Sequence, residues 1–464
     1  MLLKKLGAFS LGPIVSAFLG FITVPLITHF ISPEEYGKAS MFTLAQGIVS
    51  MLVYLGMDQA FVREFNDYRD RMSRLLLNAV AIPLGMSCLI SGLICVFRRQ
   101  VGVFLFDTDA ELTAVYMFAA LIPFMVLENF ALLKIRMEEK GVQYSFFTIL
   151  LKALILAFTV GLFFAYERSF RSVVFAMAIG EICNSVILIL VSAKSLKLRR
   201  ADFDRQLVKR MILFGLPLIP AMMMNWILSS MDKLMIRFMC GYEELGLYEA
   251  AFKIVNALAI VQSCFTLFWT PVAYRWYEEK TEKRNFNYVN TAVAIIMSVM
   301  CLLLLIAKEL VGVVLGEEFV EAIRIFPFLL LHPIMYTMSE STAVGIGFSR
   351  KTYYSIWVSA VGCVVNLVLN YVLIPIYGAT GAAIATGLSF LAFFWARTLA
   401  SRRCWWKFDM GIYYPIILIL LANCFAHTFL DNGISYAVSG VSLVLIPLIN
   451  RGRIRELIRF CKKN

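Results

Sequence analysis

The chain has 464 residues, of which 60% are hydrophobic and 16% charged, and its formal net charge is +12. A soluble domain contains roughly 45–50% apolar residues, so this composition excludes a water-soluble protein and indicates an integral membrane protein. The positive charge does not indicate nucleic-acid binding, because the lysines and arginines gather in short segments between apolar runs, as the orientation signals of membrane proteins do.

Apolar runs long enough to cross a bilayer, which takes about 20 residues, occur throughout the chain. We identify fourteen, at 7–29, 40–60, 75–97, 112–134, 146–165, 171–192, 211–237, 249–272, 288–307, 322–346, 355–375, 380–400, 411–429 and 434–449. The first run has no cleavage signal, so we interpret it as a retained span rather than a signal peptide. The last run is the weakest, since it is short and contains Pro447.

The cations between the runs define an orientation. Of the 43 Lys and Arg residues, 31 lie in alternate segments on the side of the N-terminus and six lie in the segments on the other side. Because cytoplasmic segments carry the excess of Lys and Arg, we predict that both termini are cytoplasmic. The basic stretch after Asn450 is predicted to form a short amphipathic helix on the inner leaflet.

Two pairs of short sequences indicate an internal repeat. SPEEYGKAS (32–40) matches YEELGLYEA (242–250) at an offset of 209, and KGVQYS (140–145) matches RKTYYS (350–355) at an offset of 210. Each half then has six spans and both halves enter from the same side, which is the arrangement of parallel repeats about an axis along the membrane normal. We therefore predict three domains: a six-helix lobe at 1–200, a second at 201–400, and an extra helix pair with a basic tail at 401–464.

The predicted fold class is all-α. It is a polytopic membrane protein of about 14 transmembrane helices, with two lobes around a central cavity. Prolines in the first span of each half, Pro25 in the first span and Pro217 and Pro220 in the seventh, interrupt backbone hydrogen bonds and are candidate hinges. Static kinks without motion explain the same prolines equally well.

Four carboxylates lie within the predicted spans: Glu128, Glu181, Asp232 and Glu340. A charged side chain at the centre of a span costs about 2.5–3.5 kcal/mol, so such groups must face one another or water in a cavity. We interpret these four as candidates for coupling transport to H⁺ or Na⁺. Structural ion pairing is the alternative interpretation for each of them.

Five cationic or amide side chains are candidate substrate contacts. They are Lys152, Lys253, Asn256, Asn225 and Arg63. For the two lysines, structural ion pairs are an equally good interpretation.

No metal site is expected, because the ten cysteines are scattered without a CxxC spacing and the three histidines lie on separate segments. No cofactor is expected apart from the coupling ion. The chain also carries no P-loop, GxSxG or HExxH motif and no large outer loop, so we predict a transporter rather than an enzyme.

Several sequence blocks together resemble a known family. LGPIVSAFLGFITVPLITHFISPEEYGKAS (11–40), LGMDQAFVRE (55–64), the block from FGLPLIP to AAFKI (214–254) and IPIYGATGAAIATGLS (374–389) are similar to the polysaccharide-transporter family of bacterial flippases. This family belongs to the multidrug/oligosaccharidyl-lipid/polysaccharide (MOP) superfamily and includes the Wzx-type O-antigen flippases. The resemblance covers about residues 1–400.

The resemblance implies a flippase that moves an undecaprenyl-diphosphate-linked oligosaccharide, such as an O-antigen, capsule or exopolysaccharide unit, from the cytoplasmic to the outer leaflet of the bacterial inner membrane by alternating access. It implies a cationic cavity, and a lipid-tail groove in the last helix pair. A polysaccharide polymerase and a chain-length regulator are expected partners, with membrane lipids, and we expect a monomer that binds no nucleic acid. The alternatives are a cation-coupled small-molecule antiporter of the multidrug and toxin extrusion (MATE) type and a lipid II flippase.

Overall fold

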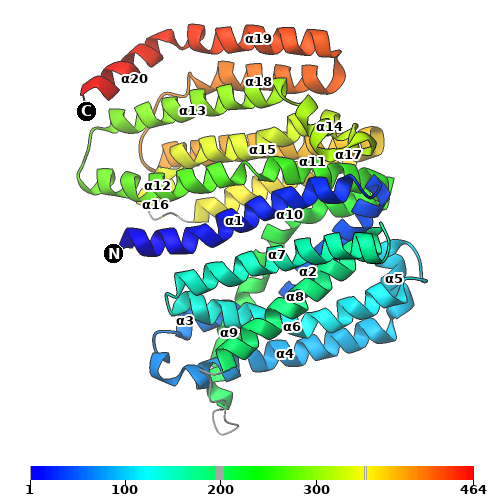
Figure 1. Ribbon diagram of the computed structural model, residues 1–464. Helices are drawn as coiled ribbons and strands as arrows, with labels where there is room; N and C mark the ends of the chain where they lie inside the picture. The colour runs from blue at the N-terminus through cyan, green and yellow to red at the C-terminus, as the bar shows by residue number, and fades with distance from the viewer. Residues whose placement is uncertain (1, 194–202, 350, 352, 464) are drawn as a thin grey trace. The chain divides into compact units, whose positions relative to one another are not determined.

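The computed structural model describes residues 2–193, 203–349, 351 and 353–463, which form helices and no strand (Figure 1). Side chains at 2–10, 192–193, 221, 225, 228 and 461–463 are not described. The chain divides into two compact units, Met1–Ser230 and Met231–Asn464, and each is treated by itself below. The all-α prediction is confirmed, while the domain boundaries near residues 200 and 400 stay predictions.

The first unit contains the helices up to the first part of α10. They are α1 (Leu2–Thr28), α2 (Pro33–Tyr54), α3 (Met57–Glu64), α4 (Met72–Val96), α5 (Arg98–Phe106), α6 (Leu112–Met137), α7 (Gly141–Ala165), α8 (Phe170–Ala193), α9 (Arg205–Gly215) and α10 (Ile219–Cys240). Short 3₁₀ turns lie at Arg69–Arg71 and Leu216–Leu218. Helix α7 packs against both α1 and α8, and α6 packs against α4 and α8.

The second unit contains the remaining helices. They are α11 (Tyr242–Asn256), α12 (Ala259–Glu278), α13 (Lys283–Ile306), α14 (Glu309–Leu315), α15 (Ala322–Thr342), α16 (Val344–Phe348), α17 (Tyr353–Cys404), α18 (Tyr413–Phe429), α19 (Asn432–Ile449) and α20 (Arg451–Lys463), with a 3₁₀ turn at Glu317–Phe319. Helix α15 is the centre of this unit, because it packs against α11, α13, α17 and α18 and most of its side chains are buried.

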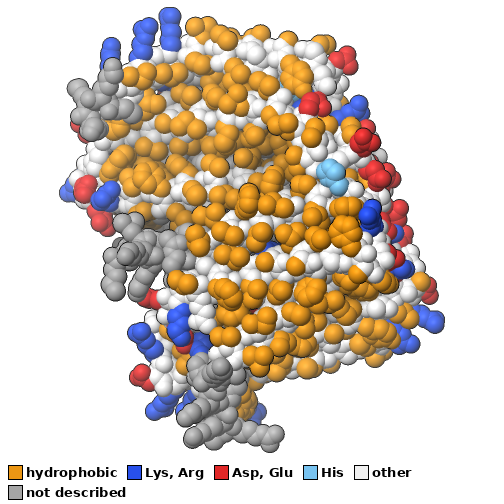
Figure 2. All heavy atoms as spheres, viewed as in Figure 1, with side chains coloured by type: hydrophobic (Ala, Val, Ile, Leu, Met, Phe, Trp, Pro, Cys, Tyr) orange, Lys and Arg blue, Asp and Glu red, His pale blue; other side chains and the backbone are white. Residues whose placement is uncertain are grey.

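Glycines permit the closest helix crossings, as expected where membrane helices pack through small residues. A Cβ atom at Gly12 on α1 would lie 2.6 Å from the backbone of Ser145 on α7, and one at Gly387 on α17 would lie 2.6 Å from the carbonyl oxygen of Phe328 on α15. Figure 2 shows the complementary surface pattern, with hydrophobic side chains over the middle of the helices and charged ones near the helix ends. Both features are those of helices surrounded by lipid.

The helices account for the fourteen apolar runs. Among the described residues, ten helices are long and apolar enough to cross a membrane, and α2 with α3 makes eleven if this pair, bent by 55°, is one span. Helix α17 has 52 residues and holds two of the runs, separated at Gly378 by non-helical φ and ψ of 55° and −134°. The other two runs correspond to α10 and the shorter α18.

Some helix ends differ from the predicted ones. The run at 249–272 is two helices, since α11 begins at Tyr242 and α12 begins only after a break at Ala257 and Leu258. The run at 211–237 is preceded by the separate helix α9, whose N-terminus is capped by Asp204, and the two are joined by a 3₁₀ turn. Pro217, in this turn, has no backbone N–H for a regular helix, which explains the interruption there.

The predicted C-terminal amphipathic helix is present as α20. Its aromatic residue Phe460 packs on Tyr288 of α13 with ring centroids 4.6 Å apart, and Glu456 pairs with Arg284 at 3.3 Å. Arg453 pairs with Asp409, in the segment before α18, at 2.7 Å. Helix α20 is therefore docked on its own unit as well as being basic.

Candidate functional site

The first unit contains a polar cluster formed by three spanning helices. Asn184 on α8 donates a hydrogen bond from Nδ2 to Glu128 Oε1 on α6 at 2.9 Å. Gln46 on α2 donates from Nε2 to Glu181 Oε2 on α8 at 3.1 Å. Glu128 and Asn184 are buried, with exposed fractions of 5% and 0%. Each of these two predicted carboxylates thus accepts a hydrogen bond from an amide side chain on another helix.

Lys152 on α7 supplies a positive charge to this cluster. It interacts electrostatically with both Glu128 and Glu181, yet its own side chain is exposed. The Oε2 of Glu128 and the Oδ1 of Asn184 are buried and have no hydrogen-bond partner among the described residues. Since a buried polar atom without a partner is costly, the cluster retains unused capacity to bind a proton, an ion or water.

The second unit contains a cluster around Asp232 on α10. The hydroxyl of Tyr248 on α11 donates a hydrogen bond to Asp232 Oδ2, and the hydroxyl of Thr386 on α17 lies 3.4 Å from the same oxygen. Asp232 is 5% exposed. The Asp232 carboxylate thus contacts hydroxyl groups of two other helices and connects α10 with α11 and α17.

The residue next to it, Lys233, has a different partner. Its Nζ pairs with Glu249 on α11 at 2.5 Å and lies 4.7 Å from the ring centroid of Phe252. Lys253, one turn after Glu249, is exposed and interacts electrostatically with that carboxylate. Asn256 is half-buried at the end of α11. Glu249 therefore lies between two lysines and organises this charged group.

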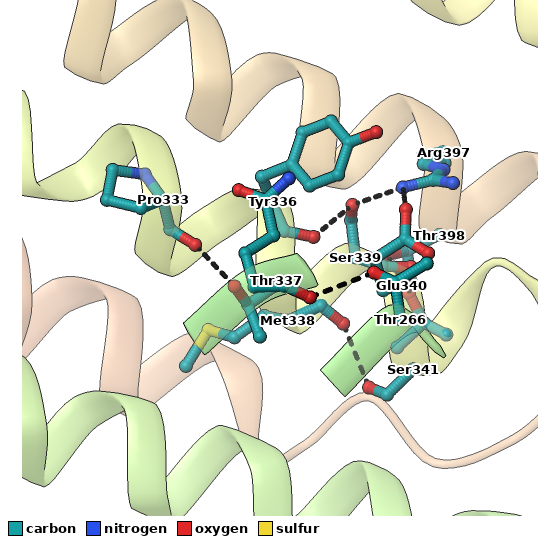
Figure 3. A network of polar contacts seen from close by, with 12 residues as sticks. Thr266, Pro333, Tyr336, Thr337, Met338, Ser339, Glu340, Ser341, Arg397 and Thr398 are labelled. Carbon is teal, nitrogen blue, oxygen red and sulfur yellow. Dashed lines mark hydrogen bonds and ion pairs between the residues drawn. The ribbon is translucent and has the colours of Figure 1, made fainter. Parts of the chain in front are cut away.

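Glu340 is held in an ion pair. Arg397 on α17 donates from Nη1 to Glu340 Oε1 at 2.7 Å and to the Ser339 hydroxyl at 2.8 Å, and Figure 3 shows the arginine directed at both. The guanidinium also lies 5.4 Å from the ring centroid of Tyr336 and 5.7 Å from that of Phe393. This geometry fits the structural-pair interpretation of Glu340 better than that of a free coupling group.

The remaining predicted site residues lie elsewhere. Arg63, on α3, is exposed and stacks 4.4 Å from the ring centroid of Phe214, in a pocket beside α9. The side chain of Asn225 lies outside the described residues. Pro25 lies inside an uninterrupted α1, whereas Pro217 and Pro220 lie where α9 meets α10.

Sequence reasoning missed Gln46, Tyr248, Glu249 and Arg397. Glu249 is the first residue of the predicted span 249–272, whereas the helix begins seven residues earlier at Tyr242. Arg397 lies near the end of the predicted span 380–400. The bend between α2 and α3 was also missed. Gly56 could have indicated this bend in the sequence. Its φ is 71°, a backbone conformation that glycine adopts more readily than other residues.

The last two apolar helices form a groove. A cavity of about 660 Å³ lies between α18 and α19 and is walled by aliphatic side chains, with Ser442 as a polar exception. The walls include Leu418, Ile419, Ile434, Val438, Val441 and Leu445. This volume lies within the roughly 300–1,000 Å³ of ligand pockets, and the lining suits a hydrocarbon. Among the described residues, no group of three His, Cys, Asp or Glu side chains is placed to hold a metal ion.

The long apolar helices define a polytopic membrane protein that carries charged side chains inside its spanning helices. The family model described as "Polysaccharide biosynthesis protein" matches residues 2–276, which is more than half of the chain. The protein belongs to this polysaccharide biosynthesis family, as the sequence blocks predicted.

Individual relatives agree with this assignment. The chain is 26% identical over 171 residues to the "Probable low-salt glycan biosynthesis flippase Agl15" of Haloferax volcanii, a match that spans 35% of each chain and so about a third of the relative's length. A solved structure of the lipid II flippase MurJ, in an inward closed conformation, superposes with a TM-score of 0.69 at 16% identity, covering 96% of this chain and 99% of that one. An inward-facing MATE family transporter of the MOP superfamily gives 0.62 at 16%, covering 83% and 94%. The fold is that of MOP superfamily transporters.

Proposed function

We propose that the protein is a flippase that moves an undecaprenyl-diphosphate-linked oligosaccharide from the cytoplasmic to the outer leaflet of a bacterial inner membrane by alternating access. The observation that carries the proposal is an exposed lysine on an apolar spanning helix of each unit, Lys152 on α7 and Lys253 on α11. An exposed cation at such a position is costly in lipid but suits a diphosphate anion. We assign each lysine, in its own unit, as a candidate contact for the diphosphate, with Asn256 beside Lys253 as a further candidate.

The groove between α18 and α19 supports the same proposal. A polyprenyl chain is a long hydrocarbon, and the groove offers aliphatic walls over about 660 Å³. We assign the lipid tail to this groove, so that the anionic head and the apolar tail of one substrate each have a matching surface.

The carboxylate clusters are proposed to couple the cycle to H⁺ or Na⁺. Glu128 and Glu181 are the first choice, because the buried atoms Glu128 Oε2 and Asn184 Oδ1 have no hydrogen-bond partner in the described part of the chain. Asp232 is the second, because it is buried among hydroxyl groups. In this scheme the protein moves its substrate without chemical change, with both termini in the cytoplasm, and delivers it to a polysaccharide polymerase and a chain-length regulator.

The test compares lysine variants in cells that depend on the protein for surface polysaccharide. Lys152→Ala and Lys253→Ala are expected to abolish surface polysaccharide and to cause lipid-linked oligosaccharide to accumulate on the cytoplasmic side, at normal protein levels. Lys407→Ala is the matched control, since Lys407 is also exposed but lies outside the spanning helices. Full surface polysaccharide from both alanine variants would refute the diphosphate assignment.

A second candidate function is a MATE-like antiporter of cationic small molecules. The observation that favours it is the pair of carboxylates Glu128 and Glu181 in one cluster, which suits an organic cation. Transport of an organic cation into vesicles, abolished by Glu181→Gln and retained in Lys152→Ala, would establish this function instead. Flipping of lipid II, in place of the oligosaccharide lipid, would establish the third alternative.

A further inference from the structure

A pocket in the first unit remains outside the clusters described above. It has a volume of about 590 Å³ and lies between α3 and the segment from α9 to the following 3₁₀ turn. Its polar wall consists of Arg63, Gln206, Lys209 and Arg210. Its apolar wall consists of Leu213, Phe214, Pro217 and Leu218.

The order of these residues along the chain is informative. Positions 206, 209, 210, 213 and 214 recur at intervals of three and four, so they lie on one face of α9, and Pro217 and Leu218 extend this face into the 3₁₀ turn that follows. The first turn of this face is polar and cationic, and the following turns are apolar. The face therefore changes from charged to hydrophobic along its length, in the direction in which the chain enters the apolar run of α10.

The charges of the pocket do not cancel. Arg210 pairs with Glu64 at 2.9 Å and donates to the hydroxyl of Tyr68 at 3.1 Å. Arg63 and Lys209 form no ion pair with any described residue, and both side chains are exposed. Two cations thus remain available on facing elements, α3 and α9.

We propose that this pocket binds an anionic phospholipid of the cytoplasmic leaflet, with the headgroup phosphate on Arg63 and Lys209 and the acyl chains on Leu213, Pro217 and Leu218. A soluble anion would use the cations but leave the apolar half facing water, and Leu213 alone is 65% exposed. An amphiphile fills both halves. Basic pockets near the cytoplasmic ends of membrane helices recognise lipid headgroups by this chemistry.

The position of the pocket gives the lipid a structural role. Arg63 and Lys209 belong to α3 and α9, and a backbone contact between Gly56, just before α3, and Gly215, the last residue of α9, brings these two helices together. A phosphate held by both cations links α3 to α9 across this contact. Bound lipid therefore stabilises the junction, and this inference does not depend on the proposed substrate.

The experiment uses the purified full chain and native mass spectrometry with two lipids of equal chain length, phosphatidylglycerol and phosphatidylcholine. The wild type is expected to retain phosphatidylglycerol preferentially and to melt at a higher temperature with it. Each cation near a membrane surface contributes about 1 kcal/mol, so the double variant Arg63→Ala/Lys209→Ala should bind about 30-fold more weakly. Lys209→Arg should retain binding, and Lys407→Ala is the control with an exposed cation elsewhere.

Three results would overturn the inference: equal retention of the two lipids, unchanged phosphatidylglycerol binding in the double variant, or displacement of the lipid by inorganic phosphate or farnesyl diphosphate. The last result would assign the pocket to a free anion or to an isoprenoid diphosphate. If the double variant does not fold, the single change Lys209→Ala is used, since this side chain has no ion pair among the described residues. Its expected loss is about fivefold.

Discussion

Glu35 and Glu244 form the same hydrogen bond in the two units. Glu35 Oε2 accepts from the backbone N–H of Phe170 at 2.5 Å, and Glu244 Oε2 accepts from that of Ala379 at 2.7 Å. In each case donor and acceptor are 135 residues apart, and the two bonds are related by the offset of 209 that the sequence repeat predicts. Phe170 begins α8, and Ala379 begins the second part of α17 after Gly378, so each carboxylate lies at a helix N-terminus.

The first prediction concerns these two carboxylates. Hydrogen bonds to charged groups contribute about 1.5–3 kcal/mol, so Glu35→Gln and Glu244→Gln should each lower the unfolding free energy by about 1–2 kcal/mol. Thermal melting of the purified variants measures this. The matched control is Glu34→Gln, because Glu34 is 58% exposed and pairs with Lys38 in the next turn of the same helix. A loss in one unit without a loss in the other would contradict the equivalence of the two bonds.

The second prediction concerns the crossing at Gly56 and Gly215. A Cβ atom at either position would lie 2.5–2.7 Å from the backbone of the other segment, and Gly56 also has a positive φ. Gly56→Ala and Gly215→Ala should therefore reduce both the yield of folded protein and the melting temperature. Gly85→Ala is the control, since no described atom beyond the adjacent backbone of α4 lies within 4 Å of the added methyl group, and α4 gains about 0.5–1 kcal/mol from the change. Normal folding of both crossing variants would show that the helices can separate there.

The third prediction concerns Arg397 and Glu340. The pair is partly buried, with side-chain exposed fractions of 21% for Arg397 and 12% for Glu340. Removing one partner of a fully buried ion pair costs about 3–5 kcal/mol, so Arg397→Gln should destabilise the protein by at most that amount. Glu340→Gln/Arg397→Gln should be more stable than Arg397→Gln alone, because it removes the stranded charge. If the double variant also retains transport, Glu340 is a structural partner. Loss of transport in a stable double variant would instead return Glu340 to the coupling candidates.

The fourth prediction concerns pH and helix α20. The backbone N–H of Gly411 and the Arg453 guanidinium hold the pKa of Asp409 below its usual value. The unfolded chain has an Asp pKa of about 3.9, and the pKa of Asp409 in the folded protein is lower. The ionised carboxylate therefore stabilises the docked state at pH values above the unfolded pKa, and this stabilisation is lost as the pH falls through the folded pKa. Hydrogen exchange in α20, corrected for intrinsic rates, should therefore accelerate below about pH 4.

The size of that effect is limited. Asp409 is 53% exposed, and exposed ion pairs contribute up to about 1 kcal/mol, so the acceleration should be fivefold at most. Asp409→Asn should show the faster exchange already at neutral pH and lose the acid dependence. Arg284 and Glu456 pair independently and keep α20 partly docked. Exchange in the variant that remains as slow as in the wild type at neutral pH would exclude Asp409 as the anchor.

The sequence predicted the fold in detail because apolar length and cation placement act locally. The SPEEYG block illustrates this: Ser32 caps α2 by accepting the N–H of Glu35, and Pro33 occupies the first turn. The same block contains the glutamate that forms the repeated hydrogen bond. The block thus contains both a local helix cap and a residue that forms a long-range hydrogen bond. The weak sequence repeat therefore corresponds to the same hydrogen bond in both units.

The partners of the charged residues could not be predicted in the same way. Asp232 and Lys233 are adjacent in sequence, but the first bonds Tyr248 and the second bonds Glu249. Which helix each residue faces depends on the rotation of α10 and on the residue at which α11 begins. The predicted span began at Glu249, seven residues after the true start of α11, so this glutamate was predicted at the edge of a span rather than within a helix. Such pairings depend on packing between helices, which the periodicity of one helix does not contain.

The repeated hydrogen bond also has an evolutionary consequence. A repeat with equivalent geometry in both halves is most simply produced by duplication of one ancestral segment, so the bonds of Glu35 and Glu244 descend from a single bond that preceded the duplication. Thr23 and Val24 occupy the positions equivalent to Asp232 and Lys233, so that charged pair belongs to one copy alone. The scaffold is thus inherited by both halves, and the charges mark where the two copies diverged.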